Sequence, residues 1–262
     1  MKQKIYQVDA FAERLFSGNP AAVCPLEQWL EDEILQNIAM ENNLAETAFY
    51  VKQGDKYEIR WFTPGSEVDL CGHATLAAAY VLFNHEGHKS DIIRFHSPRS
   101  GKLTVKQTGE LLTLDFPSDI YRSVEISPEL TACFDIKPIK AFKGKTDYML
   151  IFENEQQIRS LTPHLSEISK IEARGIIATA KGEYVDFVSR FFAPQVAIDE
   201  DPVTGSAHTT LAPYWAQRLN KEELSALQLS KRGGSLICRY IGDRVEISGK
   251  AQLYLEGYIH YS

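Results

Sequence analysis

Two short segments of the sequence combine a glycine with polar side chains at the expected start of a helix. The first runs from Asp69 to Thr75 (DLCGHAT), and the second runs from Asp201 to His208 (DPVTGSAH). Each lies between a strand-like run and a helix-like run. Glycine lets a ligand approach the backbone closely, and the first free N–H groups of a helix, together with its dipole, attract an anion. Such a pair could hold a substrate carboxylate at one helix start and a carbonyl or developing enolate at the other, without a metal.

Side chains that can exchange a proton lie in or near both segments. His73 belongs to the first, and Asp201, Ser206 and His208 belong to the second. Glu46 is a further candidate, because it lies where a predicted helix gives way to a strand in ENNLAETAFYV. Purely structural roles stay open for all of them: a histidine that only forms a hydrogen bond, a serine N-cap, an aspartate in a turn, and a surface carboxylate paired with an arginine. The spacing alone does not decide between these roles and catalysis.

Several common kinds of site are excluded because their motifs are missing. No G-x-S-x-G surrounds Ser206, no G-x-G-x-x-G occurs, and position 139 is isoleucine where a phosphate-binding loop at Gly144-Lys145 needs its first glycine. The four cysteines, at positions 24, 71, 133 and 238, form no C-x-x-C pair. This spacing argues against a zinc site or a redox pair, and it predicts free thiols and no bound metal.

The composition is that of an ordinary globular protein with an acidic charge balance. Of the 262 residues, 44% are hydrophobic and 24% are charged, and the net charge is −7. The basic residues are scattered, so we expect no nucleic-acid partner, and no run of 18 apolar residues predicts a membrane span. The N-terminal stretch MKQKIYQVDAF enters a strand pattern directly, without the apolar core of a secretion signal, and we therefore expect a cytoplasmic protein.

The periodicity of apolar residues predicts many strands and few helices. In the first half, strands are expected at 5–11, 21–24, 46–52, 57–62, 92–96, 103–107 and 111–116, and helices at 26–40 and 72–83. The first helix should end at Asn42-Asn43, residues suited to a helix C-terminus. The second helix has small apolar residues on most sides, so we expect it to be buried all round. In the second half, strands are expected at 139–142, 148–152, 175–180, 185–192 and the C-terminal end, with helical zones at 155–171 and 206–219.

One arrangement occurs twice along the chain. The segment 60–64 (RWFTP) matches 190–194 (RFFAP) at a spacing of 130 residues, and Gly72-His73-Ala74 then matches 205–207 (GSA) at a spacing of 133. A shared order of strand, proline break, glycine and helix indicates a duplicated unit. We therefore predict two related halves, 1–117 and 118–262, and we allow for a last strand of the second half that crosses back to the first.

Four motifs in the same order resemble one known family. They are FSGNPAAV at 16–23, NLAETAF at 43–49, DLCGHATLAAAY at 69–80 and DEDPVTGSAH at 199–208, and they resemble the phenazine-biosynthesis PhzF-like isomerases. The resemblance covers essentially the whole chain. It implies an α+β fold of the diaminopimelate epimerase-like type, with two pseudo-symmetric halves. Each half is a mostly antiparallel β-sheet rolled around a central α-helix, and the active site lies between them.

The resemblance also implies roles for particular residues. Glu46 is similar to the general acid/base of the family, which takes a proton from one substrate carbon and returns it at another. His73 and Asp201 resemble its polar partners. Because a C–H group is a far weaker acid than a carboxylic acid, Glu46 needs help from desolvation and from donors that stabilise enolate-like charge. The expected activity is that of an isomerase.

The substrate site is likewise implied by the resemblance. Ser206 and the amides of Gly72 and Gly205 look like the cradle for the carboxylate of a small metabolite. The family pattern further implies a homodimer and an enzyme that works without a cofactor. A small-molecule binding protein that has kept the scaffold but lost turnover is the alternative.

A third possibility depends on Cys71. Cysteine-dependent racemases and epimerases share the expected fold and use two thiols, and Cys71 occupies the place of one of them. The segment 202–204 (PVT), where the second thiol would stand, has no cysteine. Inversion by two thiols is therefore disfavoured, and Cys71 is expected to be a small buried side chain.

Overall fold

The chain alternates runs that suit strands with a few runs that suit helices, and the computed structural model, which describes residues 1–261, is an α+β structure made mostly of sheet. Two compact units are present. The first comprises Met1–Asp115 and Ser248–Ser262, and the second comprises Phe116–Ile247. Each unit is described by itself below.

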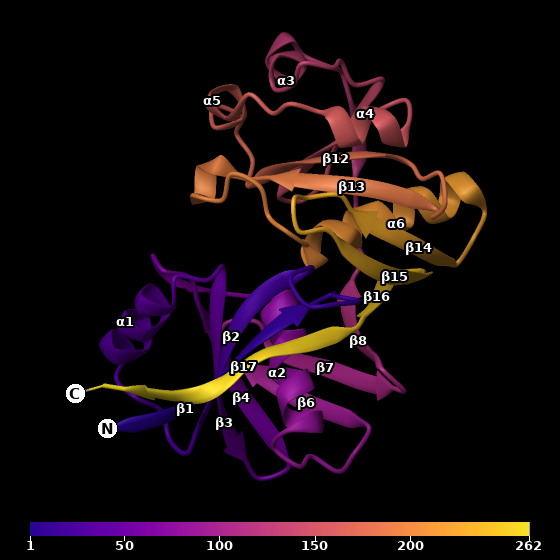
Figure 1. Ribbon diagram of the computed structural model, residues 1–262. Coiled ribbons are helices and arrows are strands. Elements are labelled where there is room, and N and C mark those ends of the chain that lie inside the picture. The colour runs from indigo at the N-terminus through magenta and orange to yellow at the C-terminus, as the bar shows by residue number, and fades with distance from the viewer. Residues whose placement is uncertain (262) are drawn as a thin grey trace. The chain divides into compact units, whose positions relative to one another are not determined.

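The first unit consists of a sheet and the helices at Asp32–Asn42 and Gly72–Asn84 (Figure 1). The sheet runs in the order β17 (Ala251–His260), β1 (Lys2–Ala10), β2 (Asn19–Leu26), β3 (Glu46–Gln53), β4 (Lys56–Phe62), β6 (Ile92–Ser97), β7 (Gly101–Thr108) and β8 (Leu111–Pro117). The short β5 (Glu67–Val68) also pairs with β4. The pairs β2/β3 and β4/β6 are parallel and the others are antiparallel. The helices are α1 (Asp32–Asn42) and α2 (Gly72–Asn84).

The helix α2 is the centre of the first unit. Every residue from His73 to Ala79 is buried, which is about two full turns, so no side of the helix over this span faces solvent. The helix packs against β1, β2, β3 and β17. Four of the seven residues are alanines, whose small side chains let the strands come close on several sides. The predicted helix and its all-round burial are confirmed.

The start of α1 differs from the predicted start of this helix, whereas its end agrees with the predicted end. Leu26 belongs to β2 rather than to a helix, and α1 begins only at Asp32. The prediction of a helix from residue 26 was wrong because the last apolar residue of the strand happens to continue the helical spacing. The predicted end is confirmed, because Asn43 caps the helix in the left-handed conformation with a φ of 48°.

The second unit has the sheet order β9 (Arg122–Val124), β10 (Lys140–Lys143), β11 (Asp147–Ile151), β12 (Gly175–Lys181), β13 (Phe187–Phe192), β14 (Glu223–Gln228), β15 (Gly234–Ile241) and β16 (Arg244–Gly249). The pairs β11/β12 and β13/β14 are parallel. Its helices are α3 (Pro128–Ala132), α4 (Glu155–Ser160), α5 (Leu165–Ile168), the 3₁₀ turn η1 (Pro194–Val196) and α6 (Gly205–Leu219).

The helical zone predicted at 155–171 contains two short helices, α4 and α5, separated by a non-helical segment. Between α4 and α5, Leu161 has an extended ψ of 122°, and Pro163 forms an isolated bridge with Phe134. Proline lacks an N–H group and disfavours helical backbone in the residue before it, which interrupts the helix.

Both units repeat one pattern, as the duplicated segments predicted. In the first unit, the pairs β2/β3, β3/β4, β4/β6 and β6/β7 are parallel, antiparallel, parallel and antiparallel in turn. In the second unit, the pairs β11/β12, β12/β13, β13/β14 and β14/β15 follow the same order. The central helix follows β4 in one unit and β13 in the other. Even an ion pair is repeated, because Arg60 Nε lies 2.8 Å from Glu67 Oε1 and Arg190 Nε lies 2.7 Å from Glu200 Oε1.

Candidate active site

Glu46 is the first residue of β3, three positions after the left-handed Asn43 that ends α1. It pairs with Ala21 in the parallel β2/β3 register and is 9% exposed. A surface carboxylate paired with an arginine was the alternative for this residue. The structure rules that role out, because the side chain is buried and its charged neighbour is a histidine.

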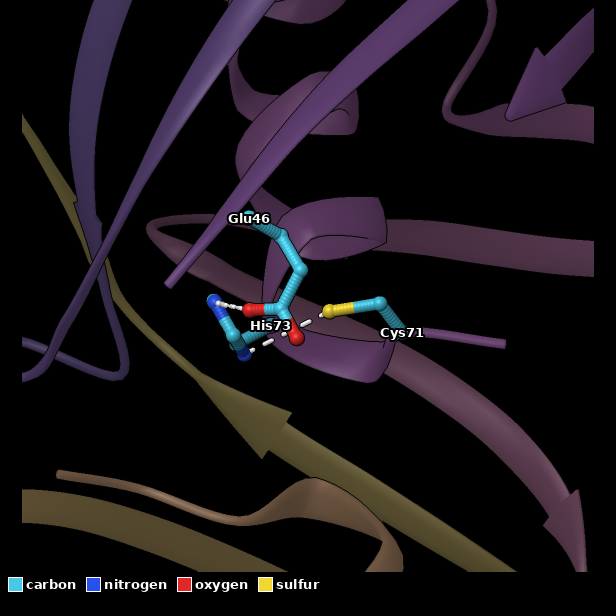
Figure 2. A group of neighbouring side chains, drawn as sticks. All are labelled: Glu46, Cys71 and His73. Carbon is cyan, nitrogen blue, oxygen red and sulfur yellow. Dashed lines mark hydrogen bonds and ion pairs between the residues drawn. The ribbon is translucent and has the colours of Figure 1, made fainter. Parts of the chain in front are cut away.

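His73 is the second residue of α2 and lies directly beside Glu46 (Figure 2). Its Nε2 atom is 3.1 Å from Glu46 Oε2. Neither of these two buried atoms makes a hydrogen bond of acceptable geometry among the described residues, so the contact is an electrostatic pairing at short range. The structure thus brings together two residues that are 27 positions apart in the sequence.

The other ring nitrogen of His73 has two neighbours. Nδ1 lies 3.2 Å from Nδ2 of Asn19 and 3.5 Å from Sγ of Cys71. Asn19 is the first residue of β2 and is fully buried. Asn19 lies in the motif FSGNPAAV, but it was not predicted to be a site residue. An asparagine at the start of an otherwise apolar strand was the available signal, because a buried amide needs partners.

The loop before Asn19 requires glycine. Gly18 has a φ of +69°, and a Cβ atom added there would lie 2.2 Å from the carbonyl oxygen of Ala10. Any other residue at this position would push β2 away from β1. The glycine therefore fixes the close entry into β2 that places the Asn19 amide next to Nδ1 of His73.

Burial and nearby charge shift the pKa of His73 in opposite directions. Burial alone would lower the pKa of this imidazole, but attraction to Cys71 and Glu46 outweighs it, and the pKa of His73 is raised well above its ordinary value. Burial, with a contribution from the charge of Glu46, raises the pKa of the Cys71 thiol to about 11. Since such a thiol is uncharged at neutral pH, Glu46 is the anion that favours the charged imidazole under those conditions.

The thiol of Cys71 is a poor base for the same reason. Cys71 is buried and serves as the N-cap residue of α2, with an extended backbone. A proton-abstracting thiolate requires a lowered pKa, whereas this one is raised. The geometry agrees with the expectation that Cys71 is a small buried side chain.

Gly72 begins α2, and within residues 1–261 no side-chain hydrogen bond caps the N-terminus of this helix. Its first amides therefore retain the capacity to bind an anion next to Glu46 and His73. The carboxylate-binding role expected for Gly72 is compatible with this position.

In the second unit, Asp201 stands in a buried turn before α6. Thr204 Oγ1 donates a 2.6 Å hydrogen bond to Asp201 Oδ2. Gln228, buried on β14, ties the turn together: its Nε2 donates to the Asp201 carbonyl at 2.8 Å, and its Oε1 accepts from the Thr204 amide at 2.8 Å. Gln228 was not predicted, because a single polar residue at the end of a strand carries no distinctive signal.

Ser206 is the second residue of α6, following Gly205. The N-cap is Thr204, so the alternative role of Ser206 as an N-cap is excluded. Arg174 Nη1 donates a 2.9 Å hydrogen bond to Ser206 Oγ, while Arg174 Nε donates to Asp147 Oδ1 at 2.9 Å. Because its oxygen already accepts from a guanidinium, the hydroxyl of Ser206 is free to direct its own hydrogen toward a ligand.

The contacts of His208 indicate a structural role rather than a catalytic one. Its ring is fully buried, and Nδ1 lies 2.8 Å from the Thr204 carbonyl oxygen one helical turn earlier. Burial lowers the pKa of His208 to about 4, so the ring is neutral at physiological pH. Thr75 occupies the equivalent position of α2 and donates to the Cys71 carbonyl at 2.5 Å. In both units this side chain satisfies the N-cap carbonyl.

The comparisons with known proteins agree with this architecture. The family model described as phenazine biosynthesis-like protein (PhzC-PhzF) matches residues 8–257. The chain belongs to this family. An uncharacterized isomerase from Pseudomonas aeruginosa is 50% identical over 260 residues, covering 99% of this chain and all of the relative.

Solved structures of the phenazine biosynthesis-like family are also similar. A PhzF family protein from Enterococcus faecalis has a TM-score of 0.97 at 47% identity, with all of both chains covered. A predicted epimerase from Pseudomonas aeruginosa has a TM-score of 0.77 at 19% identity, covering 99% of this chain and all of that chain, which is a likeness of fold. The diaminopimelate epimerase-like fold is confirmed, and membership of this family classes the chain as an isomerase.

Proposed function

We propose that this isomerase moves a proton between carbons of a small carboxylate-bearing metabolite, with Glu46 as the general acid/base and without a cofactor. The observation that carries the proposal is the buried carboxylate of Glu46, 3.1 Å from the imidazole of His73 and beside the N-terminus of α2. Buried acid–base pairs of this kind are concentrated at catalytic sites.

The proposed reaction is balanced within the substrate. Glu46 takes a proton from one carbon, and the electron pair of the broken C–H bond enters the adjoining unsaturated system. The resulting enolate-like anion is stabilised by the imidazole of His73 and by the first amides of α2. Glu46 then returns the proton at a second carbon, so no oxidant or metal takes part.

His73 has two tasks in this scheme. It holds the carboxylate of Glu46 in place, and its raised pKa supplies positive charge where negative charge develops. In the second unit, we propose that Ser206 and the Gly205 amide bind the substrate carboxylate, and that Asp201 acts as a further polar partner. The orientation of Ser206 by Arg174, and of the Asp201 turn by Gln228, supports these roles. A homodimer and a cytoplasmic location complete the proposal.

The test uses candidate carboxylic acids in deuterated water. We expect carbon-bound deuterium with the native protein and a rate about 10² to 10⁴ lower with Glu46→Gln, which keeps the shape but cannot accept the proton. The matched control is Cys71→Ala, which should still label the substrate.

Each other outcome contradicts the proposal in a different way. Labelling that persists in Glu46→Gln and disappears in Cys71→Ala would assign the chemistry to the thiol. An acid that binds, as shown by thermal stabilisation, but exchanges no hydrogen would instead identify a binding protein on this scaffold.

A further inference from the structure

Three side chains with different metal-ligating atoms meet at the start of α2. They are the carboxylate of Glu46 from β3, and the Cys71 thiol and the His73 imidazole from the N-terminus of α2. One ligand atom from each residue lies within 4.8 Å of the others (Figure 2). All three residues are at least nine-tenths buried, so the cluster is part of the interior and not a solvated surface group.

The spacing of these atoms suits a tetrahedral ion. Zinc binds cysteine sulfur at about 2.3 Å and histidine nitrogen at about 2.0–2.1 Å, which places two such ligands about 3.5 Å apart in a tetrahedron. The distance from Cys71 Sγ to His73 Nδ1 is 3.5 Å. The two atoms are therefore already as far apart as two ligands of one zinc ion.

Two further observations favour a cation at this place. Glu46 Oε2 is a buried carboxylate oxygen without a hydrogen bond of acceptable geometry among residues 1–261, and a bound cation would satisfy it. A carboxylate and a thiolate together also neutralise a divalent ion, so the buried complex has no net charge.

We propose that Cys71, His73 and Glu46 form a reversible Zn²⁺ site, with Sγ, Nδ1 and a carboxylate oxygen as ligands and water in the fourth position. On binding, the S–H bond of Cys71 and the Nδ1–H bond of the charged His73 break, both protons leave to solvent, and a sulfur–zinc and a nitrogen–zinc bond form. The Asn19 amide gives up its contact with Nδ1. No oxidation or reduction is involved.

The ligand set selects the ion. Mg²⁺ and Ca²⁺ prefer oxygen ligands, whereas zinc accepts sulfur, nitrogen and oxygen together. The missing C-x-x-C pair argued against a zinc site, but that argument applies only to zinc bound by a pair of neighbouring cysteines. The third ligand, Glu46, precedes Cys71 by 25 residues and His73 by 27, and it reaches them only through the fold.

Zinc at this position would have one functional consequence. It would withdraw the carboxylate of Glu46 from proton transfer and so switch the enzyme off until the metal is removed. This consequence rests on the proposed function, whereas metal binding itself does not. Glu46 keeps 12% of its side-chain surface exposed, so the cluster is not fully closed off from solvent.

The test uses metal binding alone and needs no substrate. Titration of the full chain with Co²⁺ should give the absorption of a tetrahedral cobalt–thiolate complex at one ion per chain. Zn²⁺ should displace Co²⁺ and remove the absorption, and Mg²⁺ should not. We expect no cobalt–thiolate absorption in Cys71→Ala, and an affinity about tenfold weaker or more in Glu46→Gln.

The controls separate this site from the other thiols. Cys238→Ala, which removes a buried cysteine of the second unit, should leave the titration unchanged. Cys71→Ser, closer in size to cysteine, serves if the alanine variant fails to fold, as judged by its thermal unfolding. Absence of the cobalt–thiolate absorption in the native protein, or its persistence in a folded Cys71 variant, overturns the proposal.

Discussion

The imidazole of His73 can be neutral or charged, and the residue on its Nδ1 side must suit both forms. A neutral ring with its proton on Nε2 needs a donor at Nδ1, whereas a charged ring needs an acceptor. The amide of Asn19 can present either its NH₂ group or its oxygen by turning about one bond, and it lies 3.2 Å from Nδ1. Asparagine is thus suited to a histidine that changes its charge during a reaction.

This role predicts opposite effects for two substitutions of Asn19. In Asn19→Asp a carboxylate stands next to Nδ1, and we expect the pKa of His73 to rise by about 1 unit or more. In Asn19→Leu the ring loses its partner while burial remains, so the pKa of His73 should fall. Nitrogen NMR of labelled imidazole over a pH series measures both changes, and His208, with a pKa near 4, provides an internal reference. Identical His73 titration in all three proteins would refute the role.

At the level of single residues, the sequence indicated site residues inside its two glycine segments. It did not indicate the residues that contact and orient them. His73 and Ser206 are recognisable because each directly follows a glycine at a helix start, and Asp201 lies in the same segment four residues before its glycine. Their supports, Asn19, Gln228 and Arg174, lie between 27 and 54 positions away along the chain. Such contacts follow from strand pairing, which periodicity does not specify.

At the scale of elements, the end of α1 determines where β3 begins. Asn43 turns the chain in the left-handed region with a φ of 48°, and Glu46 starts the strand three residues later. The turn lets the polar end of the helix connect to a strand buried over its first six residues. Strand periodicity alone would allow β3 to shift by a residue, which would turn Glu46 to the opposite face.

Substitutions of Asn43 test this turn. Left-handed backbone costs a residue with a β-carbon roughly 1–2 kcal/mol, and asparagine tolerates it better than a β-branched residue. We therefore expect Asn43→Val to lower the free energy of unfolding by about 1 kcal/mol and Asn43→Gly to leave it nearly unchanged. Urea unfolding measures both values. Asn220 ends α6 with a φ of 53°, so Asn220→Val and Asn220→Gly should repeat the contrast, and equal effects of valine and glycine would count against it.

At the scale of the whole molecule, the duplication explains why one site residue was ambiguous. His208 was a candidate from its place in DPVTGSAH, but the repeat aligns it with Thr75, and both side chains contact the N-cap carbonyl of their own central helix. The repeat was visible in the sequence as two matched segments, and the shared order of parallel and antiparallel pairs confirms it. The strand order itself could not be predicted, because it depends on contacts between distant segments.

The buried, neutral state of His208 makes the stability of the molecule sensitive to acid. Its folded pKa of about 4 lies below the ordinary value of 6.5, so the unfolded chain binds the proton more readily. The stability from the neutral ring is therefore present above pH 6.5 and lost as the pH falls to 4, by roughly 3 kcal/mol. His73, whose folded pKa is raised, contributes in the opposite direction, since its stabilisation is complete below pH 6.5 and declines only as the pH rises.

The substitution His208→Thr should remove this acid sensitivity. Threonine is the residue that the other unit uses at the equivalent position, so it can satisfy the Thr204 carbonyl without titrating. The smaller side chain leaves space in the core and lowers stability at every pH, and for this reason the readout is the slope of the unfolding free energy between pH 6.5 and 4. We expect a flatter slope in His208→Thr and an unchanged slope in His96→Asn, which replaces an exposed histidine of β6. A slope as steep as that of the native protein would show that His208 is not the group that couples folding to acid.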